Sequence, residues 1–137
     1  MKTPTRILVA LLLLSPVSAL AQTPKTPAPP RETQAAFDGY IAKFRAALKA
    51  NDSAAVASMV KLPFMGDKAS SDAAQFRAKT YPTVFTAKNR ACLQGKKPAY
   101  DRDGENNDAF HIFCGQSIFT FTKTPSGFLL TDVDAND

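Results

Sequence analysis

Two cysteines, Cys92 and Cys114, are the side chains of this chain best suited to covalent or metal chemistry. A thiol pair forms a disulfide, exchanges with other thiols or ligates zinc, depending on its spacing and neighbours. The spacing is not the Cys-x-x-Cys of redox sites, and a single histidine is present to complete a zinc shell. We therefore predict a structural disulfide, which requires an oxidising compartment.

His111, the only histidine, has the chemistry of a general base. It lies among phenylalanines with no nearby serine, thiolate or acid in the sequence, which favours a structural or interfacial role. Asp132 and Asp134 share one face of the last expected strand. Such a pair does acid–base chemistry when one member is buried, but a solvated strand end also explains it. No catalytic residue is assigned, the enzyme question stays open, and a non-enzymatic role is favoured.

Acidic and amide side chains crowd residues 101–108, and their oxygens suit calcium. The spacing differs from a calcium-binding EF-hand loop, because Gly104 is fourth rather than sixth and no glutamate stands twelfth. A polar hairpin turn accounts for the same residues. The sequence predicts no metal ion and no cofactor.

The first residues have the pattern of a secretory signal peptide. A basic start is followed by the apolar run Ile7–Leu14, and the small residues Ala19 and Ala21 stand where a signal peptidase reads. We expect residues 1–21 to be removed and the mature protein to be periplasmic or secreted. No later stretch is long and apolar enough to act as a membrane anchor.

Composition and charge limit the classes of protein to which this chain can belong. The formal net charge is +5, but no run of Lys or Arg stands out beyond Lys96-Lys97, so the sequence argues against a nucleic-acid partner and a membrane-surface role. Residues 22–32 are rich in proline and form a linker. Residues 33–137 are long enough for one small domain.

Hydrophobic spacing changes from helical to extended along this domain. Apolar residues at helical spacing predict a helix over 33–50, and helices are also expected over 53–60, 70–79 and 82–93. From there the period is two, which predicts strands over 99–102, 109–123 and 128–134. The expected fold is α+β, with N-terminal helices on one face of a curved antiparallel sheet.

The long strand expected over 109–123 has two aromatic faces. If Cys114 faces the helices, the opposite face exposes three phenylalanines to solvent. A monomer rarely tolerates such an apolar patch. Either a bulge near Gly115 flips the alternation, or a partner covers this face. The interface candidates are His111, Phe113, Phe119 and Phe121.

The pattern resembles the nuclear-transport-factor-2-like superfamily, the cone-shaped fold of ketosteroid isomerase. The resemblance covers about residues 33–134 and rests on the opening helix 37–44, Leu62-Pro63-Phe64, the helix pair around Tyr81-Pro82 and the start of the long strand at 104–113. It implies a pocket between the first helix and the sheet, and an outer sheet face used for dimerisation. The ligand-pocket candidates are Tyr40, Phe44, Phe64, Phe76 and Phe85.

These features lead to three functional hypotheses. The first is an exported, non-enzymatic interaction protein that binds a protein partner or a second copy through its aromatic sheet face, as an envelope accessory or toxin-neutralising protein. The second is a protein that binds an apolar small molecule inside the cone. The third is an isomerase or hydrolase similar to ketosteroid isomerase. Fold resemblance alone does not choose among them.

Overall fold

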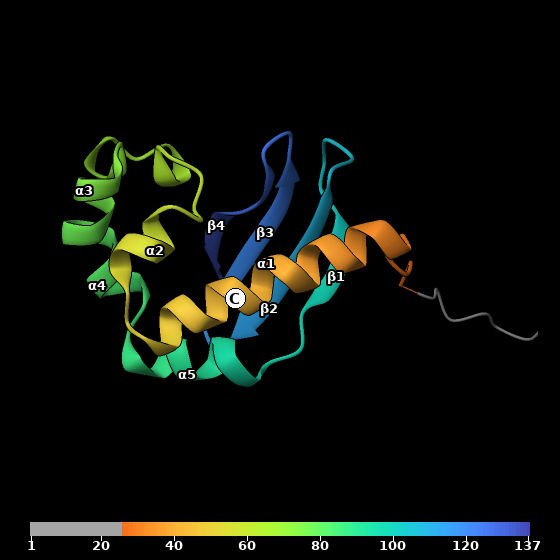
Figure 1. Ribbon diagram of the computed structural model, residues 1–137, viewed down its shortest axis with the longest axis horizontal. Coiled ribbons are helices and arrows are strands. Elements are labelled where there is room, and N and C mark those ends of the chain that lie inside the picture. The colour runs from red at the N-terminus through yellow and green to blue at the C-terminus, as the bar shows by residue number, and fades with distance from the viewer. Residues whose placement is uncertain (1–25) are drawn as a thin grey trace, which may run out of the picture.

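The computed structural model describes residues 26–137, in which helices precede a single four-stranded antiparallel sheet (Figure 1). The α+β architecture expected from the sequence is confirmed. The expected signal peptide lies outside the described residues. Among residues 26–137, no helix has both the length and the apolar character needed to cross a membrane.

The longest helix, α1 (Arg31–Lys49), crosses one face of the sheet (Figure 1). Its apolar residues recur at helical spacing, so they line one side and point into the core. Phe37, Ile41, Phe44 and Leu48 are all buried on this side. The helix predicted over 33–50 is thus confirmed, and it begins two residues earlier because Pro30 suits the position before a first turn.

The remaining helices are short and connected by tight turns. They are α2 (Ser53–Ala57), η1 (Phe64–Gly66), η2 (Lys68–Ser70), α3 (Ala73–Gln75), the π-helical η3 (Phe76–Thr80), α4 (Tyr81–Val84) and α5 (Ala87–Gly95).

The continuous helix predicted over 82–93 was wrong. The chain leaves helical geometry at Phe85, and Thr86 starts α5 by accepting a hydrogen bond from the Asn89 backbone N–H at 3.2 Å. A threonine in this position caps the second helix, because its hydroxyl replaces a missing intrahelical partner.

The sheet consists of β1 (Ala99–Arg102), β2 (Asp108–Cys114), β3 (Ser117–Thr124) and β4 (Gly127–Ala135), in that spatial order. The single strand predicted over 109–123 was wrong, because the chain reverses at Gly115. Gly115 has φ +62°, a conformation that glycine adopts without strain. Cys114 pairs with Ser117 across this tight hairpin.

The hairpin inverts the predicted exposure of two phenylalanines. Phe119 pairs with Ile112, and Phe121 pairs with Phe110, so both face the helices with their partners. Phe119 and Phe121 are each 0 % exposed. Their prediction as exposed interface residues was therefore wrong, whereas Phe113, on the other face of β2, is 47 % exposed.

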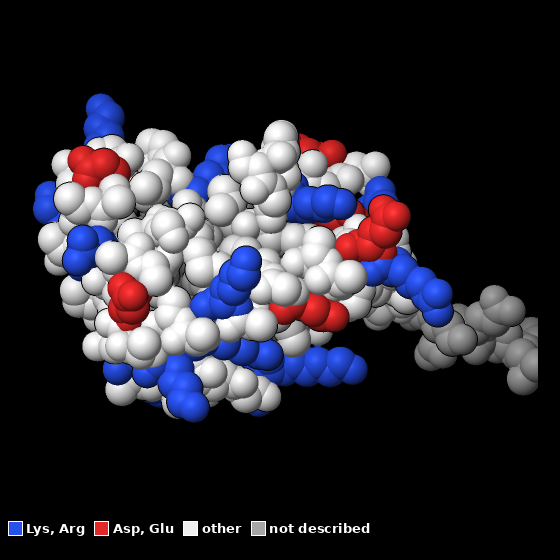
Figure 2. Space-filling view, viewed as in Figure 1, with Lys and Arg blue, Asp and Glu red and all other residues white. Residues whose placement is uncertain are grey.

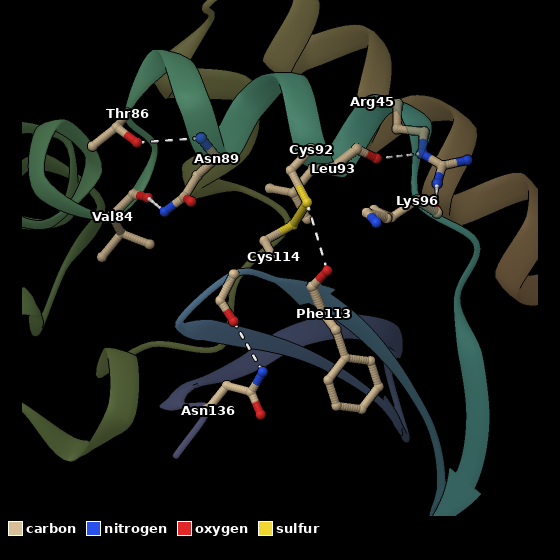
Figure 3. The surroundings of a disulfide bond; sticks show 11 residues. Arg45, Val84, Thr86, Asn89, Cys92, Leu93, Lys96, Phe113, Cys114 and Asn136 are labelled. Atoms are coloured by element: carbon tan, nitrogen blue, oxygen red, sulfur yellow. Dashed lines mark hydrogen bonds between the residues drawn. A yellow bond between two sulfur atoms is a disulfide. The ribbon is translucent and has the colours of Figure 1, made fainter.

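The predicted disulfide between Cys92 and Cys114 is present, with Cα atoms 5.8 Å apart (Figure 3). It joins α5 to the end of β2. The bridge holds a helix against the sheet in the folded domain. It stabilises the fold because it also restricts the conformations of the unfolded chain.

A polar cluster joins α1 to the sheet at its opposite end. The carboxylate of Asp108 accepts hydrogen bonds from the Tyr100 hydroxyl at 2.7 Å and the Thr33 hydroxyl at 3.0 Å. Arg102 and Lys123 lie 3.6 and 4.0 Å from its oxygens. The hydrogen bond from Tyr100 is the largest of the causes that lower the pKa of Asp108. Asp108 is therefore held ionised at the junction of three strands and a helix.

Candidate functional site

A groove of about 550 Å³ lies on the outer face of the sheet, the face turned away from α1. Side chains from β3 and β4 form its floor, and the β1–β2 and β3–β4 turns form its end. Lys61, just after the short bridge between Val60 and Leu130, stands at its β4 side. The lining residues are Lys61, Asp103, Glu105, Asn107, Thr120, Thr122, Lys123, Thr124, Pro125, Thr131 and Asp132.

Threonine hydroxyls form the floor of the groove. Strand alternation places Thr120 and Thr122 outward, because Phe119 and Phe121 point inward. A register shift between Thr120 and Phe121 leaves Thr131 unpaired on β4, so it joins Asp132 beside the groove.

Hydrogen bonds join these hydroxyls and determine which of them donates and which accepts. Thr131 Oγ1 donates to the Thr120 carbonyl at 3.2 Å, so the Thr122 hydroxyl is the donor in its 2.8 Å bond to Thr131. The protons of Thr122 and Thr131 are therefore used within the sheet, while oxygen lone pairs remain for an incoming group. His111 Nδ1 and Thr120 Oγ1 share a further bond of 3.0 Å.

Asp132 is the carboxylate at the floor of the groove. Partial burial raises its pKa, and the nearby Asp134 carboxylate raises it further. Its Oδ1 accepts a hydrogen bond from the Val133 backbone N–H at 3.0 Å. A carboxylate in this state gains from an incoming cation or hydrogen-bond donor, which would restore part of its lost solvation.

The β1–β2 turn is organised by Asp103. Its carboxylate accepts bonds from the backbone N–H groups of Glu105 and Asn107 at 2.9 and 2.8 Å, and from the Asn107 side chain at 3.0 Å. The Asn107 side chain is the largest cause of its lowered pKa. The turn thus uses Asp103 to hold its own backbone. Within the described part of the chain, no three His, Cys, Asp or Glu side chains cluster as a metal site.

The five ligand-pocket candidates form part of the packed core. Phe44, Phe64, Phe76 and Phe85 are fully buried, and their rings contact one another at centroid distances of 5.4–6.4 Å. Tyr40 donates its hydroxyl to the Met59 carbonyl at 2.8 Å, and burial raises the pKa of its phenol. Aromatic rings therefore occupy the space between α1 and the sheet.

The structure places the two remaining interface candidates on the outer face. His111 is half-buried beside Thr120, and Phe113 is exposed near the disulfide end of the sheet, its ring directed away from α5 (Figure 3). Phe113 pairs with Ile118, which is half-buried on the same face. The outer face thus has an apolar end and a polar groove.

Sequence reasoning missed the residues that line the groove. Threonine is common in strands, so Thr120 and Thr122 gave no signal of a site in the sequence. Only the pairing of β3 with β4 brings them next to Thr131 and Asp132. One signal was available: the apolar residues Phe110, Ile112 and Cys114 occupy even positions before Gly115, whereas Phe119 and Phe121 occupy odd positions directly after it. That change of parity indicates a hairpin.

No protein-family model, curated protein or solved structure matches this chain.

Proposed function

We propose that this is an exported, non-enzymatic binding protein that engages a protein partner through the outer face of its sheet. The observation that carries the proposal is that the groove and the exposed Phe113 lie on the same face of the sheet. Protein interfaces combine an apolar anchor with surrounding polar contacts, and this face offers both.

The chemistry of the groove supports a partner rich in hydrogen-bond donors. Hydroxyl lone pairs and the Asp132 carboxylate are acceptors, and the Glu105 carboxylate adds another at the turn. Lys61 and Lys123 supply positive charge at the rim and suit a partner carbonyl or carboxylate. A polypeptide segment presents both kinds of group along its backbone.

The filled interior also supports the interaction proposal over a small-molecule carrier. A ligand between α1 and the sheet would have to displace rings such as Phe44 and Phe121, which lie 5.2 Å apart by their centroids. Because these rings are fully buried and in contact, a ligand between them would require rearrangement of the core. The space that remains for an apolar ligand is an open groove of about 400 Å³ between α1 and the β3–β4 turn, where Tyr40 and Phe128 contribute to the lining.

The isomerase or hydrolase hypothesis requires a perturbed acid next to a substrate cavity. Among the described carboxylates, Asp132 is the one whose pKa is raised, and it lies in the outer groove rather than in the interior. We propose a binding role for Asp132, because its groove is open and no second acid–base group lies within hydrogen-bond distance of its carboxylate.

The resemblance to the nuclear-transport-factor-2-like superfamily stays a proposal. Helices followed by an antiparallel meander are compatible with it, but the sheet is open, with β1 and β4 at its edges. The disulfide fits the proposed periplasmic or secreted location, since such bonds persist in oxidising compartments. An envelope-accessory or toxin-neutralising role is compatible with that location.

The test is co-purification from the cell that exports the protein. The tagged chain is compared with Phe113→Ser and with Met65→Ser, a matched change at an exposed side chain on η1. We expect Phe113→Ser alone to lose a stoichiometric protein partner, or to lose a second copy in sedimentation velocity. Equal association by all three proteins would contradict the proposal.

A further inference from the structure

Six of the 17 Lys and Arg residues of the chain lie on two helical segments that contact each other. They lie in two segments, 41–50 and 86–98, which contain no Asp or Glu. All 12 acidic residues therefore lie elsewhere in the sequence. The residues of this basic face are Arg45, Lys49, Lys88, Arg90, Lys96 and Lys97; Lys43, in the first segment, lies on the other flank of α1, beside Lys123 and Phe128.

The fold joins the two segments directly. Arg45 on α1 donates from Nε to the Leu93 carbonyl at 2.8 Å and from Nη2 to the Lys96 carbonyl at 2.7 Å (Figure 3). Gln94 returns a bond to the Arg45 carbonyl at 2.8 Å. Figure 2 shows Lys and Arg side chains gathered over the lower part of the molecule, where α5 and the second half of α1 lie.

Four of the six side chains are lysines, all exposed. In the part of the chain that the structure describes, the ion pairs are those of Asp108 with Arg102 and Lys123, so the basic-face lysines have no carboxylate within ion-pair distance. Arg45 and Arg90 instead bind backbone carbonyls. The ammonium groups are therefore available to an external anion.

The character of this face points to a lipid surface. Between the lysines, the exposed positions are small residues such as Ala42, Ala46 and Ala91, and the only aromatic residue of the two segments, Phe44, is fully buried. A protein partner needs an apolar or aromatic anchor at its centre, and single-stranded nucleic acid is bound through stacking aromatics. Dispersed ammonium groups without an anchor suit a layer of phosphate headgroups.

We propose that the basic face docks this protein reversibly onto an anionic phospholipid bilayer. The sequence argued against such a role because its basic residues are scattered, but the contact between α1 and α5 concentrates them. This surface is built from helices and is separate from the outer sheet face. The proposal therefore stands or fails independently of the proposed protein partner.

The test measures binding of the secreted protein to vesicles, after intact mass has shown that residues 1–21 are absent. Vesicles of phosphatidylcholine with about a third phosphatidylglycerol are compared with pure phosphatidylcholine, at about 0.05 M and about 0.5 M salt. We expect sedimentation with the anionic vesicles at low salt and release at high salt. Equal binding to neutral vesicles would overturn the proposal.

A matched pair of variants locates the contact. Lys49→Gln with Lys96→Gln and Lys97→Gln removes three charges from the basic face, which should weaken vesicle binding about a hundredfold.

The control removes three exposed charges elsewhere, through Arg31→Gln, Lys68→Gln and Lys79→Gln, and should change binding less than about threefold, since screening limits distant charges. Equal weakening by both variants would overturn the proposal, as would tighter binding to DNA than to anionic vesicles in the same buffer. Unchanged unfolding midpoints verify that both variants are folded.

Discussion

The inner face of the sheet is apolar and the outer face largely polar, although both belong to the same strands. On the inner face, Phe110, Phe121 and Leu130 lie side by side and are fully buried. One residue along β3, Thr122 turns a hydroxyl to the groove. The alternation of extended chain thus separates a surface that stabilises the fold from a surface that is free to bind.

This difference shows where the fold tolerates change. Inner residues contact rings from α1 and from neighbouring strands, so truncation leaves a cavity. Outer residues contact each other and solvent, so truncation removes a hydrogen bond at most. Substitutions on the two faces should therefore separate loss of stability from loss of association.

The largest difference in stability is expected between substitutions at two neighbouring residues that lie on opposite faces of the sheet. Phe121→Ala should lower the free energy of unfolding by about 3–5 kcal/mol, because its ring packs against Phe37, Tyr40 and Phe44. Thr122→Ala loses one hydrogen bond and should cost about 1 kcal/mol or less. Urea denaturation of both variants measures the difference, and equal losses would contradict the assignment of faces.

The disulfide should have the next largest effect, because it joins α5 to the inner end of β2. Replacing Cys92 and Cys114 by serine should lower the free energy of unfolding by about 2–4 kcal/mol. The same loss should follow when a reductant is added to the unsubstituted protein. A reductant that leaves the unfolding midpoint unchanged would show that the bond contributes little.

Asp108 provides a pH-dependent test at the junction with α1. Its pKa is lowered in the fold, so it contributes stability above its unfolded value of about 3.9, and this contribution is lost as the pH falls toward the folded value. Asp108→Asn should cost about 1 kcal/mol at pH 7. The difference between the two proteins should shrink below about pH 4. A difference that is constant from pH 7 to pH 3 would contradict this role.

Asp132 should have the smallest effect on stability, and its ionisation should destabilise the fold, whereas that of Asp108 stabilises it. Its pKa is raised in the fold, so its ionisation lowers stability above the folded pKa, and the penalty disappears as the pH falls below about 3.9. Asp132→Asn should stabilise the protein at pH 7 by less than about 0.5 kcal/mol while weakening partner binding. A clear loss of stability at pH 7 would show that the carboxylate is structural.

Much of the fold follows from local patterns. The apolar stripe of Phe37, Ile41 and Phe44 identified α1, and the helix expected over 70–79 contains α3, which Asp72 caps by accepting a hydrogen bond from the Gln75 backbone N–H. The hairpin at Gly115 was missed because residues on both sides favour strands, so propensity alone reads a single element. The break at Phe85 was missed because apolar spacing continues across it.

The candidate site was less accessible to sequence reasoning, since it depends on contacts between distant segments. His111 and Phe113 were placed on the outer face, but Phe119 and Phe121 were placed there wrongly because the reversal was absent from the prediction. The basic face was also missed, since Arg45 and Lys96 meet only when α5 packs on α1.

The most direct test of the outer face as the binding surface is site-specific photocrosslinking in the exporting cell. A photoreactive phenylalanine analogue replaces Phe113 in one protein and Met65, the other large exposed apolar side chain of the described residues, in a second. We predict one discrete crosslinked protein species from position 113 and none of the same mass from position 65. The same species from both positions, or none from position 113, would contradict the role of the outer face.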